Sequence, residues 1–301
     1  MNHRFPATSD RPILILGASG QVGRALAQKL DARALAVSRQ EADLANPTRL
    51  PILLDSLRPS VVINAAAYTQ VDRAEQEEPL VQIINGEAPG ILARWCAAHD
   101  VPFVHYSTDY VYSGEGISPW TEDAPVSPVN AYGRTKLMGD LAVAGAGGNW
   151  LIFRTSWVYD TQGKNFLNTI IRLGKERESL RIISDQHGAP TYAPDLADAT
   201  LEILGRALTQ PRFPNGVYHL CNSGETTWHE FATEILVRVR EQGAELKVRN
   251  IEAIPTTEYP LPARRPLNSR LSLEKVHKIF GIKLPNWRLG LRRCLQEMMY
   301  F

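Results

Sequence analysis

Short runs of apolar residues alternate with longer amphipathic stretches in the first half of the chain. The runs at 13–16, 34–37, 61–67 and 101–107 are short and continuous, as expected of strands that are buried on both faces of a sheet. Between them, residues 22–30, 47–57 and 79–98 carry apolar side chains at helical spacing. Strands that alternate with helices of this length predict a parallel sheet, and so a Rossmann-type fold.

The second half continues the alternation less regularly. Strands are predicted at 150–154, 180–184 and 217–221, and helices at 132–144, 166–174, 195–208, 272–280 and 289–299. Thr227 and Glu230 have the spacing of a capping box, which predicts that a further helix begins there. The proline-rich stretch 254–266 is predicted to be a loop, long enough without structure of its own to suggest a function.

Together these elements predict the α/β class, with a Rossmann-type doubly wound parallel sheet and a smaller α/β substrate-binding domain. We expect the dinucleotide-binding domain to comprise residues 12–155 together with roughly 192–218. The substrate-binding domain is expected at roughly 156–191 and 219–301. Residues 1–10 are expected to form a loose tail.

The composition is that of an ordinary globular protein and limits the kind of partner. Of 301 residues, 44% are hydrophobic and 22% charged, and the net charge is +1 without a basic run. Neither nucleic acid nor a membrane is therefore expected as a partner, and no apolar run is long enough to span a bilayer. Cys96, Cys221 and Cys294 lie far apart, so neither a disulfide framework nor a zinc site is predicted. A reducing cytoplasm fits these features.

A glycine turn directly follows the first predicted strand. Gly17, Gly20 and Gly23 have the spacing G-x-x-G-x-x-G and surround Gln21 and Val22. One glycine would make the tight turn, another would let the backbone approach a pyrophosphate, and the third would pack the helix on the strand. The position between a strand and a helix favours a dinucleotide site over a turn that is merely rich in small residues.

The end of the second strand bears on the choice of cofactor. Where an NAD site often has an acid for the ribose 2′-hydroxyl, this chain continues from the strand into Ser38 and Arg39. These two residues favour a 2′-phosphate and therefore NADPH, with NADH as the second candidate; a merely exposed Arg39 is the alternative. Asp43 and Leu44, shortly afterwards, are expected to flank the adenine.

Small and polar residues end the third and fourth strands, at the carboxyl edge where open α/β sheets bind ligands. The third strand runs into Asn64, Ala65, Ala66, Ala67, Tyr68 and Thr69, where small side chains would let a dinucleotide lie against the backbone. A buried strand alone would explain the alanines but not the polar residues that bracket them. Ser107, Thr108 and Asp109 end the fourth strand, so their polar groups are expected to point into the same crevice.

Tyr132 and Lys136 form a Y-x-x-x-K pattern at the start of a predicted helix. The i,i+4 spacing places the phenol and the ammonium on one face, about one turn apart. A cation beside a phenol favours the phenolate, so Lys136 is expected to lower the pKa of Tyr132 from its ordinary value of about 10. An exposed tyrosine–lysine pair is the alternative for the pattern alone, but the glycine turn and Thr108 favour a catalytic pair.

A nucleotide turn, a hydroxyl at a strand end and Y-x-x-x-K, in this order, resemble the extended short-chain dehydrogenase/reductase superfamily. The resemblance implies that Tyr132 is the general acid/base, that Lys136 lowers its pKa and holds the nicotinamide ribose, and that Thr108 orients the substrate oxygen. We also expect Tyr106, in the fourth strand, to contact the cofactor.

Longer blocks look like the dTDP-4-dehydrorhamnose reductase family, and the similarity covers nearly everything from about residue 12 to 298. The blocks are 64–69 with 71–75, 105–112, 154–159, 185–191 and 264–269. This resemblance implies hydride transfer from NADPH or NADH to C4 of dTDP-4-dehydro-L-rhamnose, giving dTDP-L-rhamnose. Tyr132 would donate the proton to the developing alkoxide.

The same resemblance implies which residues hold the substrate. Thr108, Asp109 and Trp157 fall where the family holds the sugar, with a core aromatic as the alternative for Trp157. Arg264 and Arg265, in the proline-rich loop, would pair bidentately with the diphosphate, with an exposed loop pair as the alternative. The expected partner is dTDP-4-dehydro-L-rhamnose, and the protein is expected to be a monomer or a homodimer.

One departure from the family concerns a metal ion. Some members are associated with magnesium at a dimer contact built from glutamates, and two of those places are Ala25 and Pro194 here. Glu297 is acidic as the pattern requires, and Asp195 follows one residue after the place that Pro194 occupies. Hard cations need several oxygen ligands, so we expect neither a metal site nor dimerisation through magnesium.

Two other functions fit parts of the sequence. A nucleotide-sugar epimerase or dehydratase of the same superfamily would keep NAD bound. Dehydratases, however, usually need further acidic catalytic residues, and no glutamate follows Asp109. A non-catalytic regulatory subunit on this fold, like a partner of methionine adenosyltransferase, would not need Thr108, Tyr132 and Lys136 together.

Overall fold

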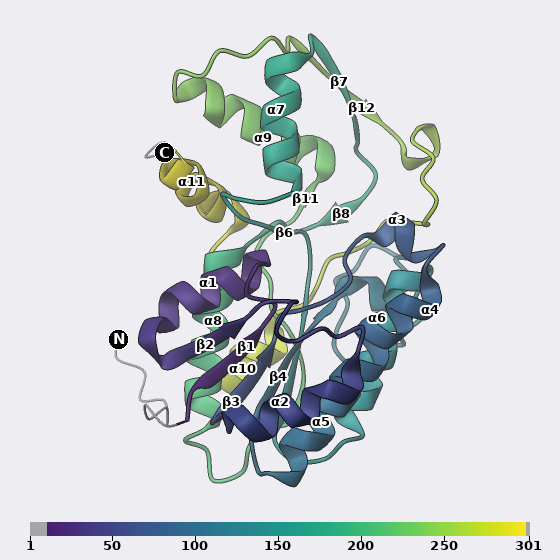
Figure 1. Ribbon diagram of the computed structural model, residues 1–301. Coiled ribbons are helices and arrows are strands. Elements are labelled where there is room, and N and C mark those ends of the chain that lie inside the picture. The colour runs from purple at the N-terminus through teal and green to yellow at the C-terminus, as the bar shows by residue number, and fades with distance from the viewer. Residues whose placement is uncertain (1–10, 299–301) are drawn as a thin grey trace.

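A six-stranded parallel sheet is the largest element of the computed structural model, which describes residues 11–298 (Figure 1). Its strands are β1 (Ile13–Leu16), β2 (Ala34–Val37), β3 (Val61–Asn64), β4 (Phe103–Thr108), β5 (Trp150–Thr155) and β10 (Gly216–His219). They lie in the order β10-β5-β4-β3-β1-β2, and every neighbouring pair is parallel. This sheet confirms the predicted Rossmann-type fold. The expected tail at 1–10 lies outside the described residues.

Helices cover both faces of the sheet. They are α1 (Gln21–Leu30), α2 (Leu50–Leu57), α5 (Ala88–Ala98), α6 (Ala131–Ala144), α8 (Ala193–Ala207) and α10 (Glu274–Phe280). In β1, Ile13 and Ile15 belong to the core under α1 and α8, whereas Leu14 and Leu16 belong to the core under α2 and α5. Because both faces are covered, every side chain of this strand is apolar, which explains the continuous runs in the sequence.

The predicted helix at 79–98 contains a π-helical turn. α4 (Glu78–Gln82), the π-helical segment Ile83–Glu87 and α5 follow one another directly. Asn85 lies in this segment, and its side chain exchanges hydrogen bonds of 2.8 and 3.0 Å with the backbone of Tyr68. The π-helical turn thus holds the polypeptide that follows β3, next to the predicted cofactor site.

A smaller group of elements lies beyond the carboxyl edge of the sheet (Figure 1). It contains β7 (Ser179–Ile183), β12 (Asn250–Ile254), α7 (Phe166–Glu176), α9 (Trp228–Glu241) and α11 (Trp287–Met298), with a short helix α3 (Val71–Ala74) nearby. The short strands are β6 (Val158–Tyr159), β8 (His187–Gly188), β9 (Thr191–Tyr192) and β11 (Thr226–Thr227). A separate hydrophobic core joins α7, α9 and α11. The capping box of Thr227 and Glu230 is present, as predicted.

The strand β12 was missed by the sequence pattern. Three of its five side chains are exposed and only Ile254 is buried, so no apolar run marks it. It pairs in parallel with β7 and ends where the predicted loop begins. The division of the chain into two domains stays a prediction. Among residues 11–298, no helix is long and apolar enough to cross a membrane.

Candidate active site

A cleft of about 750 Å³ lies along the carboxyl edge of the sheet. Most of the predicted site residues line it: Gly17, Gly20, Gln21, Val22, Arg39, Asp43, Leu44, Ala65, Ala66, Ala67, Tyr68, Thr69, Tyr106, Thr108, Asp109, Tyr132, Lys136 and Trp157. Four predicted residues do not line this cleft, namely Gly23, Ser38, Arg264 and Arg265. The fold therefore gathers the glycine turn, the strand ends and the Y-x-x-x-K helix at one place.

The glycine turn packs tightly against the end of β3. Gly17 has a φ of +85°, and a Cβ on it would lie 2.7 Å from the backbone nitrogen of Ala66. A Cβ on Gly23 would lie 2.1 Å from the carbonyl oxygen of Gly17, so this glycine packs the helix on the turn instead of lining the cleft. The absence of side chains at these positions leaves a backbone cradle at the start of α1, which fits a pyrophosphate.

The end of β2 holds an acid that the sequence pattern did not reveal. The backbone N–H of Ser38 donates a 2.7 Å hydrogen bond to the carboxylate of Glu41. Hydrogen bonds from Ser38 lower the pKa of Glu41 and keep it ionised. Arg39 is 74% exposed and pairs with Asp43 at 3.3 Å. An acid therefore does lie at the end of this strand, because Glu41 folds back onto Ser38 beside Arg39.

Thr108 and Tyr132 approach each other from β4 and α6. Asn130 caps α6 by accepting a 2.8 Å hydrogen bond from the backbone of Gly133, which places Tyr132 in the first turn. The hydroxyl of Thr108 donates to Asp109 at 3.0 Å. The ring of Tyr110 meets that of Tyr132 edge-on, with 5.8 Å between centroids. The phenol is thus enclosed between a hydroxyl and an aromatic ring.

The electrostatics of Tyr132 differ from the prediction. Burial raises the pKa of Tyr132 above its ordinary value, the negative charges of Asp109 and Asp140 raise it further, and a hydrogen bond with Thr108 opposes them. Lys136 does not produce the expected lowering. Its Nζ donates a 2.6 Å hydrogen bond to the carbonyl of Tyr106 and lies 3.2 Å from Nε2 of His105. Burial lowers the pKa of Lys136 to about 8.

Asp109 is a buried carboxyl group beside the phenol. It is 3% exposed, and burial raises its pKa to about 7. Within the described residues, Oδ2 of Asp109 and the hydroxyls of Ser107 and Thr155 have no partner in good hydrogen-bond geometry. Ser269 nevertheless lies close enough to Asp109, and Ser107 close enough to Asp140, to lower the pKa of each carboxyl against the effect of burial. Asp109, Ser107 and Thr155 all line the cleft. Unpaired buried polar atoms of this kind need a partner, which a polar ligand can supply.

Two stacked tryptophans form the far side of the cleft. The rings of Trp157 and Trp228 lie almost parallel, with 3.6 Å between centroids and 13° between planes. Trp157 adopts a φ of +48°, which is uncommon for a residue with a side chain. Both residues line the cleft and neither is fully buried. Trp228 was missed because a tryptophan at a helix start carries no signal of a site in the sequence.

A second cavity of about 680 Å³ shares Tyr110 and Trp228 with the cleft. Arg265 lines it, is mostly buried, and pairs with Asp72 at 2.7 Å. Arg264 has an exposed side chain that lines neither cavity, while its carbonyl accepts a 2.8 Å hydrogen bond from Asn130. The two arginines predicted to act together therefore lie in different surroundings.

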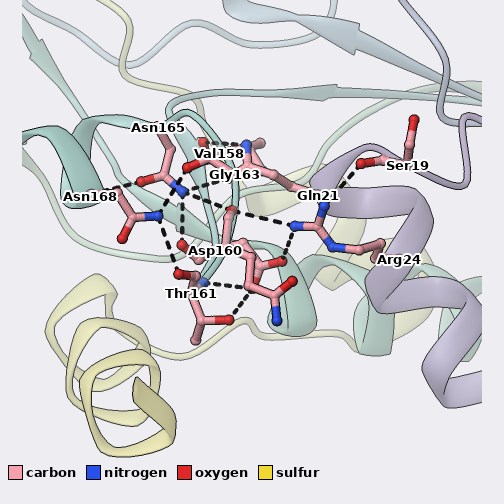
Figure 2. A network of polar contacts seen from close by, with 10 residues as sticks. Ser19, Gln21, Arg24, Val158, Asp160, Thr161, Gly163, Asn165 and Asn168 are labelled. Atoms are coloured by element: carbon pink, nitrogen blue, oxygen red, sulfur yellow. Dashed lines mark hydrogen bonds and ion pairs between the residues drawn. The ribbon is translucent and has the colours of Figure 1, made fainter. Parts of the chain in front are cut away.

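A network of polar contacts connects the glycine turn with the loop before α7 (Figure 2). Arg24 pairs with Asp160 and donates to the carbonyl of Ser19. Gln21 donates to the carbonyl of Val158 and accepts a 2.9 Å hydrogen bond from Asn165. The sequence pattern did not reveal this network, because its members lie more than 130 positions apart in the chain.

The region where the family pattern places magnesium contains an ion pair. Asp195 is 4% exposed, pairs with Arg293 and accepts a 2.8 Å hydrogen bond from Asn222. Within residues 11–298, no three or more His, Cys, Asp or Glu side chains are arranged to hold a metal ion.

Comparisons with known proteins show the family to which the chain belongs. The family model described as RmlD substrate binding domain matches residues 11–300. The dTDP-4-dehydrorhamnose reductase of Burkholderia thailandensis is 47% identical over 294 residues, covering 95% of this chain and 99% of the relative. The enzyme of that name from Salmonella typhimurium is 44% identical, covering 95% and 97%.

Solved structures give the same result. The dTDP-4-dehydrorhamnose reductase of Bacillus anthracis in complex with NADP has a TM-score of 0.88 and 32% identity, covering 95% of this chain and 99% of that one. The orthologue from Clostridium acetobutylicum has a TM-score of 0.88 and 33% identity, covering 96% and 99%. The chain therefore belongs to the dTDP-4-dehydrorhamnose reductase family.

Proposed function

We propose that this protein reduces the C4 ketone of dTDP-4-dehydro-L-rhamnose to the alcohol of dTDP-L-rhamnose, with NADPH as the reductant. The observation that carries the proposal is the convergence of Thr108, Tyr132 and Lys136 on the cleft that also contains the glycine turn. The names of the similar enzymes from Burkholderia thailandensis and Salmonella typhimurium support this reaction.

The cofactor would lie along the carboxyl edge of the sheet. Gly17, Gly20 and the start of α1 would receive its pyrophosphate, and Ala65 to Ala67 leave room beside the backbone. The largely exposed Arg39 would exchange its pairing with Asp43 for a 2′-phosphate, which favours NADPH, although the carboxylate of Glu41 opposes it. When bound, NADPH supplies the hydride that C4 receives. The Bacillus anthracis relative was solved with NADP.

Tyr132 would supply the proton. Its raised pKa means that the phenol is protonated at neutral pH, so a proton is present at Oη for the oxygen that becomes the hydroxyl at C4. Thr108 would hold the same substrate oxygen by a hydrogen bond and so fix its distance from Oη. Lys136 would hold the nicotinamide ribose with its Nζ, which already lies against the backbone of β4.

The remaining residues would place the sugar nucleotide. Trp157 would cover the sugar ring, and the unpaired Oδ2 of Asp109 would accept a hydrogen bond from a sugar hydroxyl. The second cavity adjoins the cleft at Tyr110 and Trp228 and is lined by Arg265, so we place the nucleotide there. We also place the protein in the cytoplasm, because its three buried cysteines are unpaired.

An assay of NADPH oxidation with freshly generated dTDP-4-dehydro-L-rhamnose tests the proposal, with and without EDTA. We expect NADPH to be oxidised at the same rate with and without EDTA. NMR should identify dTDP-L-rhamnose as the product. Absence of turnover with substrate that a known reductase consumes would overturn the proposal in favour of a regulatory subunit. Tightly retained NAD in the purified protein would instead favour an epimerase or dehydratase.

A further inference from the structure

Three buried side chains form a row that begins at Lys136, in the lining of the cleft, and leads into the protein. They are Asn64 at the end of β3, His105 in β4 and Lys136 in α6, and each is at most 1% exposed. Nδ2 of Asn64 lies 3.2 Å from Nδ1 of His105, and Nζ of Lys136 lies 3.2 Å from Nε2 of the same ring. The imidazole therefore has a nitrogen-bearing side chain at each of its two nitrogens.

The backbone sets the orientation of the Asn64 amide. Its Oδ1 accepts a 3.2 Å hydrogen bond from the N–H of Ala66, so its Nδ2 faces the imidazole. An amide nitrogen only donates, so Nδ1 of His105 accepts, and a neutral ring then carries its proton on Nε2. Burial and the charge of Lys136 hold the pKa of His105 well below its ordinary value, which keeps the ring neutral.

This tautomer conflicts with a charged lysine. An ammonium group has three donors and no acceptor, whereas a neutral amine accepts one hydrogen bond. If Lys136 is charged, Nε2 of His105 must accept, and the ring proton must lie on Nδ1, where it faces the hydrogens of Asn64. If Lys136 is neutral, every contact is satisfied. The carbonyl of Tyr106, 2.6 Å from Nζ, accepts from the lysine in both states.

We infer that Asn64 and His105 are positioning residues that couple the charge of Lys136 to the tautomer of the His105 ring. When Lys136 releases one proton to solvent, the ring proton changes from Nδ1 to Nε2, and the ring carries one proton in both states. The importance of Lys136 for turnover rests on the proposed function. The coupling itself is a property of the protein alone.

Other charged groups near Lys136 act on the same equilibrium. Asp140, one turn further along α6, favours the charged lysine, but it is itself paired with Arg154 of β5 at 3.1 Å. Tyr132 lies one turn earlier on the same helix and stays a neutral phenol at neutral pH because its pKa is raised. Burial has the larger effect and lowers the pKa of Lys136 to about 8. The lysine thus titrates in a range that solution measurements reach.

The coupling is measured by NMR of the full chain labelled with ¹⁵N-histidine and ¹³Cε-lysine, with signals assigned through Lys136→Met and His105→Gln. As pH rises, we expect the ring proton of His105 to change from Nδ1 to Nε2. The midpoint pH of this change should equal the midpoint pH at which Lys136 loses its proton. In Lys136→Met the Nε2-protonated tautomer should persist throughout. A single tautomer at every pH in the wild type, or an imidazolium with its own midpoint, would overturn the inference.

Asn64→Asp provides a second test, because both carboxylate oxygens accept. His105 should then stay protonated on Nδ1, and the midpoint of Lys136 should rise by about one pH unit or more. Asn85→Asp is the charge control: it places a carboxylate on the π-helical segment, from which no hydrogen bond reaches His105. This control should retain the tautomer change. Retention of the change in Asn64→Asp would contradict the inference.

Melting curves show whether the variants are folded. If Asn64→Asp is not folded, the titration of the wild-type protein decides alone. The outcomes for function and for coupling are separable. A protein that shows the tautomer change but does not turn over substrate would contradict the proposed function only. An active reductase in which His105 never changes tautomer would contradict the coupling only.

Discussion

Arg24 of α1 and Asp160, in the loop before α7, form an ion pair with 3.0 Å between Nη2 and Oδ2. The hydrogen bond between Asn165 and Gln21 runs beside it (Figure 2). The same loop contributes Lys164 to the lining of the cleft. The pair therefore joins the glycine turn, where the cofactor is expected, to the elements that would hold the substrate.

Removing this ion pair should weaken cofactor binding. A partly exposed pair contributes about 0.2–1 kcal/mol, so Asp160→Asn is expected to raise the Kd for NADPH by a factor of roughly 1.4 to 5 in a fluorescence titration. The matched control is Lys29→Ala, which breaks the pair between α1 and Asp198 away from the cleft. Its Kd should not change. Equal effects of both substitutions would show that the contacts in Figure 2 have no special relation to the cofactor.

Tyr132→Phe should lose turnover but retain cofactor binding. Removal of the hydroxyl deletes the proposed proton donor, and general acid catalysis contributes about 100- to 10,000-fold in rate. We expect kcat to fall within this range, while the Kd for NADPH changes less than about threefold, since the ring still fills its place beside Tyr110. Steady-state kinetics and fluorescence titration measure the two quantities. A variant with nearly normal kcat would remove Tyr132 from the mechanism.

Asp109 should make stability depend on pH. Its folded-state pKa of about 7 lies above the ordinary value, so its contribution is fully present at low pH and is lost as pH rises towards 7. Asp109→Asn removes the cost of the buried charge, and the gain in unfolding free energy should be larger at pH 8 than at pH 5 by about 2 kcal/mol. Denaturant unfolding at the two pH values measures it. Asp123→Asn removes a carboxylate at an exposed position and is the control; an equal pH dependence in this variant would contradict the prediction.

The charges at the end of β2 should set the cofactor preference. Arg39→Glu is expected to shift the ratio of kcat/KM for NADPH over NADH towards NADH by about tenfold, because a cation near the 2′-phosphate is replaced by an anion. Glu41→Gln should shift the ratio towards NADPH, since the carboxylate that binds Ser38 would be lost. Measuring the NADPH-to-NADH ratio of kcat/KM in both variants distinguishes the effect of Arg39 from that of Glu41. If neither substitution changes the ratio, the 2′-position of the ribose is recognised elsewhere.

The sequence by itself determined the sheet and the place of the cleft. Ile13 to Leu16 had to be apolar throughout because both faces of β1 are covered, and this pattern is local. Gly17 and Gly23 could also be predicted, because the positive φ of Gly17 and the contact of Gly23 with the Gly17 carbonyl both arise within the turn itself. Helical spacing also placed Tyr132 and Lys136 on one face before any tertiary contact was known.

Only the tertiary structure decided the charges and the partners within the cleft. Burial has the largest effect on the pKa of both Tyr132 and Lys136, and it outweighs the local pairing that the spacing suggested. Asp109, from outside α6, raises the pKa of Tyr132 further, and His105 of β4 lies 3.2 Å from Nζ of Lys136. Trp228 and the Arg24–Asp160 pair likewise join distant parts of the chain. Desolvation and side-chain contacts depend on how the elements pack in three dimensions. Periodicity along the chain does not predict which distant residues will lie close together.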